Sequence, residues 1–487
     1  MRYSSVLSTV VVPRRFRRRL GLLVCAKWRL PALARRTFPL AVSLNRLATD
    51  FFVLMPFGRR IKINQLSFKK SAQYKYLPRP AQVIIFTPTL SFITIDAPAQ
   101  TVDDSPVKSI SICFAAAFSI LASLPTAAVA PFSPENPPEM TPLNNRQSPA
   151  YRAAKQFRRG VNLGDYLEAG KYGVTISVEE FARMKEEGFD HVRIPIGWHH
   201  YVGPAPEFQL KPEIFAQADF AITNALNNHL AVLINIHHFN ELDHDPIGAT
   251  DEFIAIWRQV SEYYKDFPAA LAFELDNEPH EAATTKVMNS IYPKVIAAIR
   301  ETNPARTLFV EPGSWGGIQE LKNLVLPPDD NLIVSVHCYD PFLFTHQGTS
   351  WAGPDVKVTG FQFPGPPEKP LVPDASLKVA PHVLEQIKKY NTLPTAKNPI
   401  SPLAFKSKLV YARAWSDYYG RPVHLGEFGC YFKADPESRA RFYKAFRQAL
   451  DEQKLGWAIW DWSANFRYWD KKNNQPMPGM RDALFGK

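Results

Sequence analysis

Cysteine is scarce in this chain: the 487 residues contain four, and only Cys338 and Cys430 follow residue 130. The closely spaced, even-numbered cysteines of small disulfide-stabilised domains are therefore absent. A chain of this length can bury an adequate core without disulfides. We expect Cys338 and Cys430 to be free and buried, with a disulfide between them in an oxidising compartment as the alternative.

Acidic residues are scarce only in the first quarter of the chain. Residues 1–106 contain 18 Lys and Arg against four acids, a net charge of +14, whereas the remainder contains 39 basic and 42 acidic residues, a net charge of −3. The overall charge of +11 therefore supports a nucleic-acid-binding protein only if residues 1–106 are functional. These residues show no sustained helical or strand period, so we interpret them as a basic extension that is unstructured or lies upstream of the true start.

The chain also lacks an apolar run long enough to span a membrane comfortably. The best candidate, residues 107–130, has one lysine, then an apolar core, then small residues, which is the layout of a secretory signal peptide. This pattern predicts a secreted or periplasmic protein without a stable membrane anchor, cleaved after Ala128 or Ala130. A buried apolar helix, or a signal-anchor behind a cytoplasmic basic tail, is the alternative.

No internal repeat or second module is visible after the signal peptide. Residues 131–150 form a short Pro-rich lead-in, and residues 151–487 have the size of one elaborated α/β barrel. Short β-rich apolar runs alternate eight times with longer segments at helical spacing, which predicts a single α/β domain with the (β/α)8 TIM-barrel fold. The predicted strands are residues 157–163, 191–196, 231–236, 271–275, 307–311, 332–336, 422–427 and 456–460. The predicted helices include residues 178–187, 213–227, 251–264, 283–300, 405–419 and 437–452.

Polar and aromatic residues are concentrated at the carboxyl ends of the predicted strands, where barrel enzymes carry their catalytic groups. Such side chains are costly to bury without a partner or a function. The group comprises Arg193, His237, His238, Asn277, Glu278, Glu311, His337, Tyr339, Glu427 and Trp460. Glu278 and Glu427 each end an apolar, strand-like run, and two carboxylates are the minimum for cleaving a glycosidic bond by double displacement.

Six short segments, one per strand in the correct order, resemble glycoside hydrolase family 5, the cellulase-like barrel hydrolases. They are Arg193-Ile194-Pro195, Asn235-Ile236-His237-His238, Asn277-Glu278-Pro279, His337-Cys338-Tyr339, Gly426-Glu427-Phe428-Gly429 and Trp460. The resemblance implies a retaining mechanism in which Glu278 is the acid/base and Glu427 the nucleophile. Glu278 must be protonated to act, so we expect burial and the charge of Glu427 to raise its pKa.

The resemblance also implies roles for the surrounding residues. Arg193 and the hydroxyl of Tyr339 would keep Glu427 ionised, and Asn277 would donate to the sugar 2-hydroxyl. His237 and His337 would hydrogen-bond sugar or a catalytic carboxylate. Trp460 would stack under the reactive sugar, the alternative being a tryptophan of the barrel core.

Two further features, Glu311 and the segment 237–245, contain residue types that are common in functional sites. Glu311 lacks the flanking residues of either catalytic motif, so we interpret it as a supporting carboxylate or a rim contact, with Trp315 as a nearby subsite. Residues 237–245 are rich in potential metal ligands, but their spacing matches neither a helical His-Glu-x-x-His site nor a calcium loop, and a sugar-facing loop is favoured. We expect no metal and no cofactor.

The connection after the sixth strand, residues 340–402, is unusually long and rich in proline and aromatic residues. Long loops without secondary structure in a compact barrel are usually functional. Its aromatic side chains suit either the wall of a sugar-binding cleft or a loop packed on itself, and Trp351 is the best subsite candidate.

These patterns predict an endo-acting retaining hydrolase of β-1,4-glucan, which acts as a monomer on polysaccharide or oligosaccharide and not on nucleic acid. The alternatives are a β-mannanase, a β-1,3-glucanase or a xyloglucanase, because the family shares its catalytic residues and the loops determine which glycosidic linkage is cleaved. A barrel that binds glycan without cleaving it is the alternative from another class.

Overall fold

The computed structural model describes residues 51–54, 60–63, 82–86, 92–96, 140–143, 145–168 and 173–486. The predicted signal peptide, most of the basic extension and residues 131–139 of the lead-in lie outside the described residues. The chain divides into two units, Met1–Leu124 and Pro125–Lys487.

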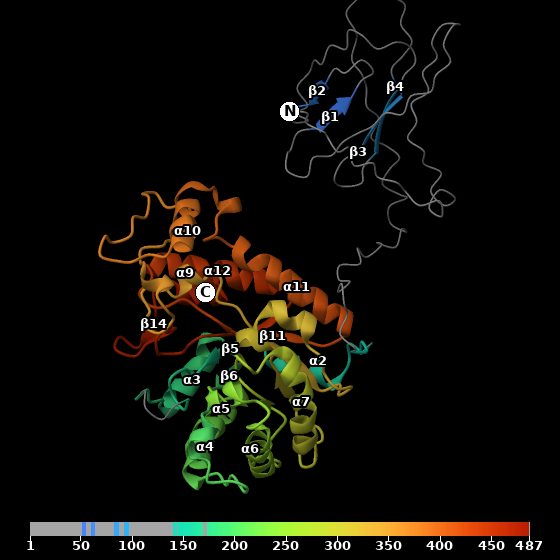
Figure 1. The fold of residues 1–487 in the computed structure, drawn as a ribbon, viewed down its shortest axis with the longest axis vertical. Helices are drawn as coiled ribbons and strands as arrows, with labels where there is room; N and C mark the ends of the chain where they lie inside the picture. The colour runs from blue at the N-terminus through green and yellow to red at the C-terminus, as the bar shows by residue number, and fades with distance from the viewer. Residues whose placement is uncertain are drawn as a thin grey trace, which may run out of the picture. The chain divides into compact units, whose positions relative to one another are not determined.

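The described part of the first unit consists of four short strands (Figure 1). Strand β1 (Phe51–Leu54) pairs antiparallel with β2 (Arg60–Ile63), and β3 (Gln82–Phe86) pairs antiparallel with β4 (Phe92–Asp96). These segments are rich in β-branched and aromatic residues, which favour strands, but runs of four or five residues are too short to show a period. The sequence therefore predicts no element where the structure has these four.

The second unit contains a closed barrel of eight strands, each pairing in parallel with its two neighbours. All eight predicted strands are present, and the predicted (β/α)8 fold is confirmed. The strands are β5 (Arg159–Asn162), β6 (His191–Ile194), β7 (Ala231–Asn235), β8 (Leu271–Glu274), β9 (Leu308–Val310), β10 (Leu332–His337), β11 (Val423–Phe428) and β12 (Gly456–Ile459).

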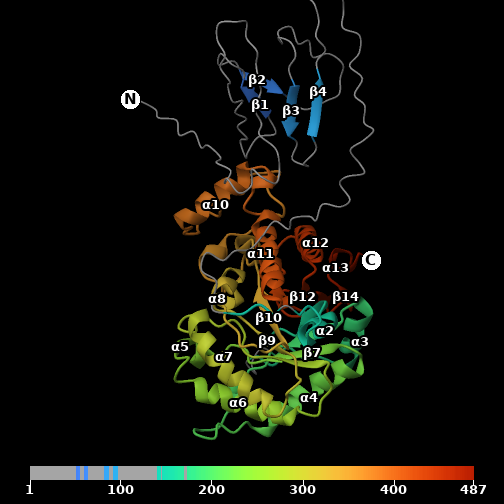
Figure 2. The same cartoon turned by 90° about the vertical axis from the view of Figure 1, so that its right-hand side faces the viewer.

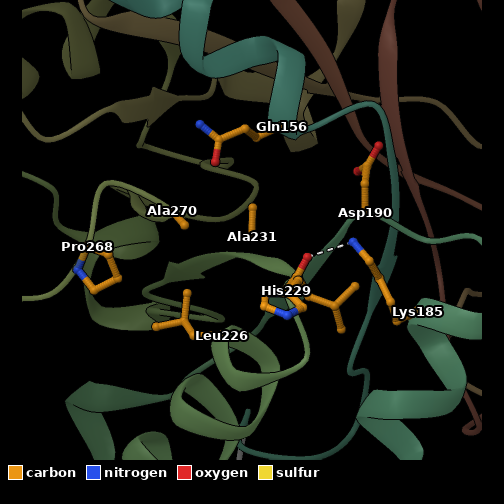
Figure 3. A pocket seen from close by; sticks show the side chains of 9 residues that line it. Gln156, Lys185, Asp190, Leu226, His229, Ala231, Pro268 and Ala270 are labelled. Carbon is orange, nitrogen blue, oxygen red and sulfur yellow. Dashed lines mark hydrogen bonds between the residues drawn. The ribbon is translucent and has the colours of Figure 1, made fainter.

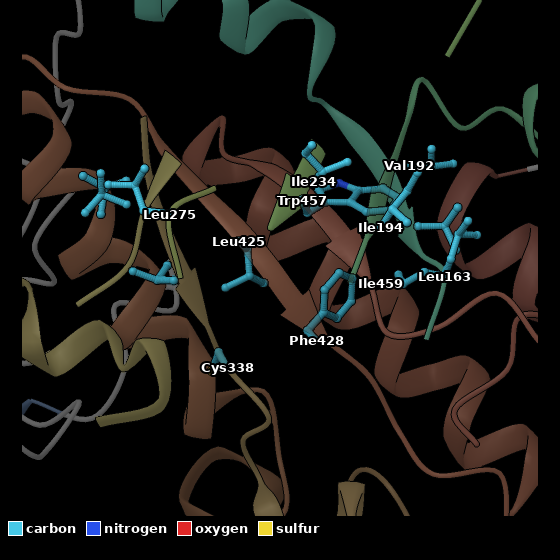
Figure 4. Close-up of a cluster of buried hydrophobic side chains, with 14 of the residues drawn as sticks. Leu163, Val192, Ile194, Ile234, Leu275, Cys338, Leu425, Phe428, Trp457 and Ile459 are labelled. Atoms are coloured by element: carbon cyan, nitrogen blue, oxygen red, sulfur yellow. The ribbon is translucent and has the colours of Figure 1, made fainter. Parts of the chain in front are cut away.

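The barrel strands are buried on both faces, which explains their nearly continuous apolar sequences. Branched aliphatic and aromatic side chains such as Val192, Ile194, Leu425 and Trp457 fill the space around the strands (Figure 4). Burying each such side chain stabilises the fold by roughly 1.5–3 kcal/mol before entropy is subtracted. The barrel is therefore a rigid support for the groups at its ends.

Six amphipathic helices surround the strands at the predicted positions. They are α3 (Val178–Glu187), α4 (Pro212–Asn227), α6 (Thr250–Tyr263), α7 (Thr285–Arg300), α11 (Leu403–Tyr419) and α12 (Pro436–Gln453). Helices α3, α4, α6 and α7 lie on one side of the strands, with α11 and α12 on the other (Figure 2). Helix α3 begins at a capping box between Ser177 and Glu180 and ends at Gly188, whose φ of +116° favours glycine.

The amino ends of the strands are closed by the segment before β5. Helix α2 (Pro149–Ala153) and a 3-10 turn (Ala154–Gln156) lead to Phe157, which packs in a buried cluster with Phe309 and Ile333. Further upstream, Met140 is also buried in the core, and the backbone N–H of Leu143 donates to Tyr419. The described end of the lead-in is thus packed against the barrel.

The connection after β10 contains more secondary structure than expected. It includes α9 (Phe342–Thr345), a 3-10 turn (Asp355–Lys357), α10 (Pro381–Thr392) and a second 3-10 turn (Thr395–Lys397). Phe344, Phe361 and Phe363 are buried, whereas Phe342 and Trp351 are exposed. The two interpretations of the loop aromatics therefore apply to different residues.

Both cysteines of this unit are free and buried, as expected. Among the described residues, no helix combines the length and apolar character needed to cross a membrane. The chain ends with a two-stranded sheet of β13 (Trp469–Asp470) and β14 (Gln475–Pro476), followed by α13 (Met480–Phe485).

Candidate active site

The carboxyl ends of the barrel strands carry the predicted polar residues. Arg193, His337 and Glu427 lie on β6, β10 and β11, while Glu278 follows β8 and Trp460 follows β12. Because all eight strands are parallel, these positions meet at one end of the barrel. Residues separated by more than 200 positions in the sequence consequently lie in direct contact.

Glu427 has a carboxylate that is almost fully buried and held by two donors. Arg193 Nη1 donates to Oε1 at 2.8 Å, and the hydroxyl of Tyr339 donates to Oε2 at 2.7 Å. His337 Nδ1 lies 3.7 Å from Oε2. Donors to both oxygens fix the orientation of the group and favour its ionised form.

Glu278 is held through both its main chain and its side chain. Its backbone has a left-handed φ of +55°, and its N–H donates to Glu311 Oε2 at 2.9 Å. Its side-chain Oε1 lies 2.8 Å from His337 Nδ1. The Glu278 side chain is 22% exposed, compared with 6% for Glu427, so Glu278 is the more accessible carboxylate.

The separation of the two carboxylates distinguishes between mechanisms. One oxygen of Glu278, one oxygen of Glu427 and a ring nitrogen of His337 all lie within 4.8 Å of one another. Retaining glycosidases place their carboxyl groups about 5–5.5 Å apart, whereas inverting enzymes need about 6.5–9.5 Å to admit a water molecule. The approach of one oxygen of each carboxylate to within 4.8 Å is on the short side of these two ranges.

Arg193 is the centre of the hydrogen-bond network beneath these groups. Its guanidinium is fully buried. It donates to Glu274, Asn162, Asn277 and Glu427. Burial acts to lower the pKa of Arg193, but attraction to the surrounding carboxylates outweighs it and raises the pKa, so the side chain stays charged.

The pKa values of the two carboxylates are ordered differently from the expectation. Burial raises the pKa of Glu427 to about 7, although His337 and Arg193 act in the opposite direction. Burial also acts to raise the pKa of Glu278, but the hydrogen bond and charge of His337 prevail and lower it. The expectation of a raised pKa for Glu278 was wrong because it omitted the cation beside this carboxylate.

His337 remains a cation for an equally local reason. Burial acts to lower its pKa, but the charges of Glu311 and Glu427 and the hydrogen bond to Glu278 raise it well above the ordinary value. Burial and the neighbouring Glu427 also raise the pKa of Tyr339 well above its usual range. Tyr339 is thus a neutral hydrogen-bond donor at all ordinary pH values.

Comparison with known proteins identifies the family. The sequence pattern of the cellulase family, glycosyl hydrolase family 5, matches residues 170–466. The endoglucanase Cel5A of Thermotoga maritima superimposes with a TM-score of 0.59 at 32% identity, covering 69% of this chain and 100% of that one. The chain belongs to glycosyl hydrolase family 5.

Sequence relatives of this family 5 chain are more distant. Endoglucanase H of Acetivibrio thermocellus is 25% identical over 64% of this chain, which spans only 30% of that relative's length. Endoglucanase C of the same organism is 25% identical over 63% of this chain and 91% of its own length. Solved structures of the Thermotoga maritima Cel5A include complexes with cellobiose and with mannotriose.

His237 in the family 5 barrel is a donor, not a metal ligand. Glu168, His237 and His238 offer ligand atoms within 4.8 Å of one another. However, the amide of Asn235 accepts from the backbone of Ile196 and donates to His237 Nδ1 at 3.2 Å. The ring proton of His237 must then be on Nε2, which leaves no lone pair there for a metal. Burial lowers the pKa of His237 well below its ordinary value, so the ring is neutral.

The three predicted tryptophans lie at different positions. Trp460 is half-buried, and its ring is parallel to His237, with centroids 5.7 Å apart. Trp315 is 56% exposed and stacks on His280, two residues after Glu278. Trp351 is 55% exposed and meets the ring of Tyr431 edge-on. Trp460 therefore lies beside the polar cluster, whereas Trp315 lies in the short helix α8 (Gly313–Gly316) and Trp351 lies in the connection after β10.

Several functional residues of the family 5 site were missed or undervalued. Glu274 and Asn162 are fully buried partners of Arg193, and Glu168 faces the two histidines of residues 237–238. Glu311, interpreted as either a supporting carboxylate or a rim contact, is fully buried and accepts from the Glu278 backbone, which fits the first interpretation. A carboxylate or amide at the end of an otherwise apolar strand is the signal that marks Glu274 and Asn162.

Two cavities lie at the opposite end of the barrel. One of about 460 Å³ is lined by residues at the amino ends of β6 to β8, including Asp190 and Ala231 (Figure 3). Lys185 on its wall donates to the carbonyl oxygen of His229 at 2.7 Å. The other, of about 330 Å³, lies beside Phe157 and His424. Neither cavity is lined by a predicted site residue.

Proposed function

We propose that this family 5 chain is a retaining, endo-acting glycoside hydrolase that cleaves β-1,4-glucan by double displacement. The observation that carries the proposal is the approach of Glu278 and Glu427 to within 4.8 Å, each with a different set of partners. Two carboxylates at this spacing suit attack by one and proton donation by the other.

Glu427 is the nucleophile in this mechanism. Its two oxygens are fixed by Arg193 and Tyr339, so the attacking lone pair has a defined direction. As Glu427 bonds to the anomeric carbon, its negative charge is lost. Arg193 remains compensated at that stage because Glu274 is also within hydrogen-bond distance. Water later releases the sugar and regenerates the carboxylate.

Glu278 is the acid in the first step and the base in the second. Its greater exposure allows it to reach the glycosidic oxygen, while its left-handed backbone is held by Glu311. It gives a proton to the departing oxygen and later removes one from the attacking water. Its side-chain oxygen lies 2.8 Å from His337 Nδ1, which can exchange a proton with it.

The remaining site residues bind the reactive sugar. Asn277 accepts from Arg193 through Oδ1, which leaves its amide N–H groups free to donate to a sugar 2-hydroxyl. His237 presents its Nε2 proton, and Trp460 offers its ring face to pyranose C–H groups. These contacts strengthen as the sugar acquires oxocarbenium character.

Endo action is supported by two exposed tryptophans outside the catalytic pair. Trp315 follows β9 beside the Glu278 turn, and Trp351 lies on the β10 connection beside Tyr431. Flat aromatic surfaces outside the reactive position suit a polymer bound over several sugar units. Trp315 and Trp351 are thus proposed as outer subsites.

β-1,4-Glucan is the favoured substrate because the relatives are described as endoglucanases and one was solved with cellobiose. β-Mannan is the second candidate, since the same Cel5A was solved with mannotriose. The mature enzyme is proposed to be secreted or periplasmic, on the sequence pattern of residues 107–130.

The deciding experiment compares wild type with Glu427→Ala on β-1,4-glucan, β-1,3-1,4-glucan, xyloglucan and β-mannan. We expect the wild type to release mixed oligosaccharides from β-1,4-glucan and Glu427→Ala to be inactive but folded. Activity confined to another polymer would change the substrate. Inactivity of the wild type on all four, with retained glycan binding, would favour a non-catalytic barrel.

A further inference from the structure

Glu311 is a fully buried carboxylate whose two oxygens face different parts of the catalytic machinery. Oε2 accepts from the backbone N–H of Glu278 at 2.9 Å. Oε1 lies 3.0 Å from Nε2 of His337, in an ion pair whose N–H is not aligned for a hydrogen bond. Glu311 thus contacts both the main chain of the proposed acid and the ring that hydrogen-bonds the acid's side chain.

Two glycines leave room for this arrangement. A Cβ atom on Gly316 would lie 2.7 Å from Glu311 Oε2 and 3.3 Å from the His337 ring. A Cβ atom on Gly426 would lie 2.9 Å from His337 Nε2. Contacts under 3.0 Å would displace the imidazole or the carboxylate, so the chain keeps both positions free of side chains.

His337 is surrounded by more negative than positive charge. Three carboxylates lie within 4.0 Å of its ring nitrogens: Glu278 after β8, Glu311 after β9 and Glu427 of β11. Glu274 of β8, His237 after β7 and His424 of β11 also interact with it electrostatically, and burial lowers the pKa of both of these histidines. Arg193 of β6 pairs with Glu274, Glu311 and Glu427. Four carboxylates against one guanidinium leave a net negative environment that an imidazolium neutralises in part. Of the four, Glu311 and Glu278 make the shortest contacts with the ring, one at each nitrogen.

We propose that Glu311 is a positioning residue for acid catalysis, holding His337 and the Glu278 backbone so that His337 and Glu278 jointly carry the proton delivered to the leaving group. The inference rests on the proposed function and deepens it. An imidazolium beside a carboxylate contains the same number of protons as a neutral imidazole beside a carboxylic acid. The raised pKa of His337 and the lowered pKa of Glu278 both mean that the proton shared by the pair is held by His337 in the resting enzyme.

The proton transfers balance in both half-reactions. In the first, the Nδ1–H bond of His337 breaks as the Oε1–H bond of Glu278 forms, and Glu278 passes a proton to the glycosidic oxygen. The bond from that oxygen to the anomeric carbon breaks as Glu427 bonds to the carbon, leaving a neutral imidazole and the ionised Glu278. In the second, water gives a proton to Glu278 while its oxygen displaces Glu427, and the proton returns to His337.

Glu311→Gln tests the proposal because it removes charge while preserving shape. The amide oxygen can still accept from the Glu278 N–H, but the amide no longer stabilises an imidazolium. For phenyl β-cellobioside, whose leaving group needs protonation, we expect kcat/KM to fall by about 100-fold. For dinitrophenyl β-cellobioside, whose leaving group needs no acid, we expect a loss of about 3-fold or less.

The pH profile distinguishes a positioning role of Glu311 from a purely structural one, because a structural role would leave the pH profile unchanged. The alkaline limb of kcat/KM should shift to lower pH by about one unit or more in Glu311→Gln, because His337 loses its proton more easily. Glu320→Gln, which removes a part-buried carboxylate bonded to Thr285 and Asn323, is the matched control and should change neither quantity. Equal losses on both substrates, or an unmoved alkaline limb, would overturn the proposal.

Nitrogen NMR of histidine-labelled protein tests the same contact without activity. The His337 ring, assigned with His337→Asn, should be an imidazolium at pH 7 in the wild type and neutral in Glu311→Gln. Glu311→Asp keeps the negative charge but shortens the side chain by one methylene group, so the His337 ring should be partly protonated at pH 7. A neutral ring in the wild type overturns the inference even if no variant folds. A wild type inactive on aryl cellobiosides would instead refute the proposed function, leaving the NMR result to decide the contact.

Discussion

The hydroxyl of Tyr339 donates to Oε2 of Glu427 at 2.7 Å, although the two residues are separated by 88 positions in the sequence. Because β10 and β11 are neighbours in the barrel, the hydroxyl and the carboxylate meet where both strands end. This single contact favours the ionised form of the proposed nucleophile in a position where burial opposes it.

Tyr339→Phe should weaken catalysis without unfolding the protein. Loss of a hydrogen bond to a charged group costs roughly 1.5–3 kcal/mol, so we expect kcat/KM to fall by about 10- to 100-fold. The acid limb of the pH profile should also move to higher pH, because one group that favours the carboxylate is gone. Tyr263→Phe, which removes an exposed hydroxyl bonded to Asp219, is the control and should leave both unchanged.

The pH dependence of kcat/KM follows from two titrations. Glu427 must be ionised to attack, and its pKa is raised to about 7, so activity should rise with pH through about 7. Activity should fall again only when the proton shared by Glu278 and His337 is lost, which the raised pKa of His337 places well above 6.5. The optimum should therefore lie on the alkaline side of 7. An optimum near pH 5 would contradict this assignment.

Arg193→Met should destabilise the barrel strongly. It leaves Glu274, Glu427 and Asn277 buried without their common donor, and removing one partner of a buried ion pair costs about 3–5 kcal/mol. Urea unfolding followed by circular dichroism would measure the change. Arg258→Ala is the matched control, because its pair with Glu301 is exposed on both sides and should be worth about 1 kcal/mol or less.

Trp351→Ala and Trp315→Ala should separate polymer binding from chemistry. Both side chains are more than half exposed, so the fold should be unaffected. We expect KM for β-1,4-glucan to rise by several-fold, while kcat/KM for a short aryl cellobioside stays the same. Phe220→Ala, an exposed aromatic residue on α4, should alter neither. An equal effect on both substrates would exclude an outer-subsite role.

The periodic parts of the fold were predictable because each depends on local sequence. All eight barrel strands and the six main helices are within a few residues of the predicted bounds, since apolar runs and amphipathic spacing report burial directly. Helix α10 was missed because prolines surround it. Pro381 is its first residue, however, and Val383, Ile387 and Tyr390 form its buried face.

The site residues that belong to short strand-end motifs were predictable. Those whose role depends on contacts with residues far away in the sequence were not. Arg193, Tyr339, Asn277 and His337 were each expected from a strand-end motif, and the structure brings all four to the carboxylate pair. Glu274 carries no such motif. Its place at the end of an apolar strand marks it as unusual, but its partner, Arg193, lies 81 positions away and is identified only by the structure.

The barrel and its two glutamates could be predicted from local features of the chain, because periodicity and strand-end polarity depend on neighbouring residues in the sequence. The distribution of protons among Glu278, His337, Glu311 and Glu427 could not be predicted in this way. Burial and charge act across a few ångströms of space, and closing the barrel places Glu274, Glu311 and Glu427 around the guanidinium of Arg193 and places His337 against Glu278 and Glu311. For that reason the pKa order of the catalytic pair was reversed from the expectation, and of the two interpretations of Glu311 the supporting carboxylate, not the rim contact, fits the structure.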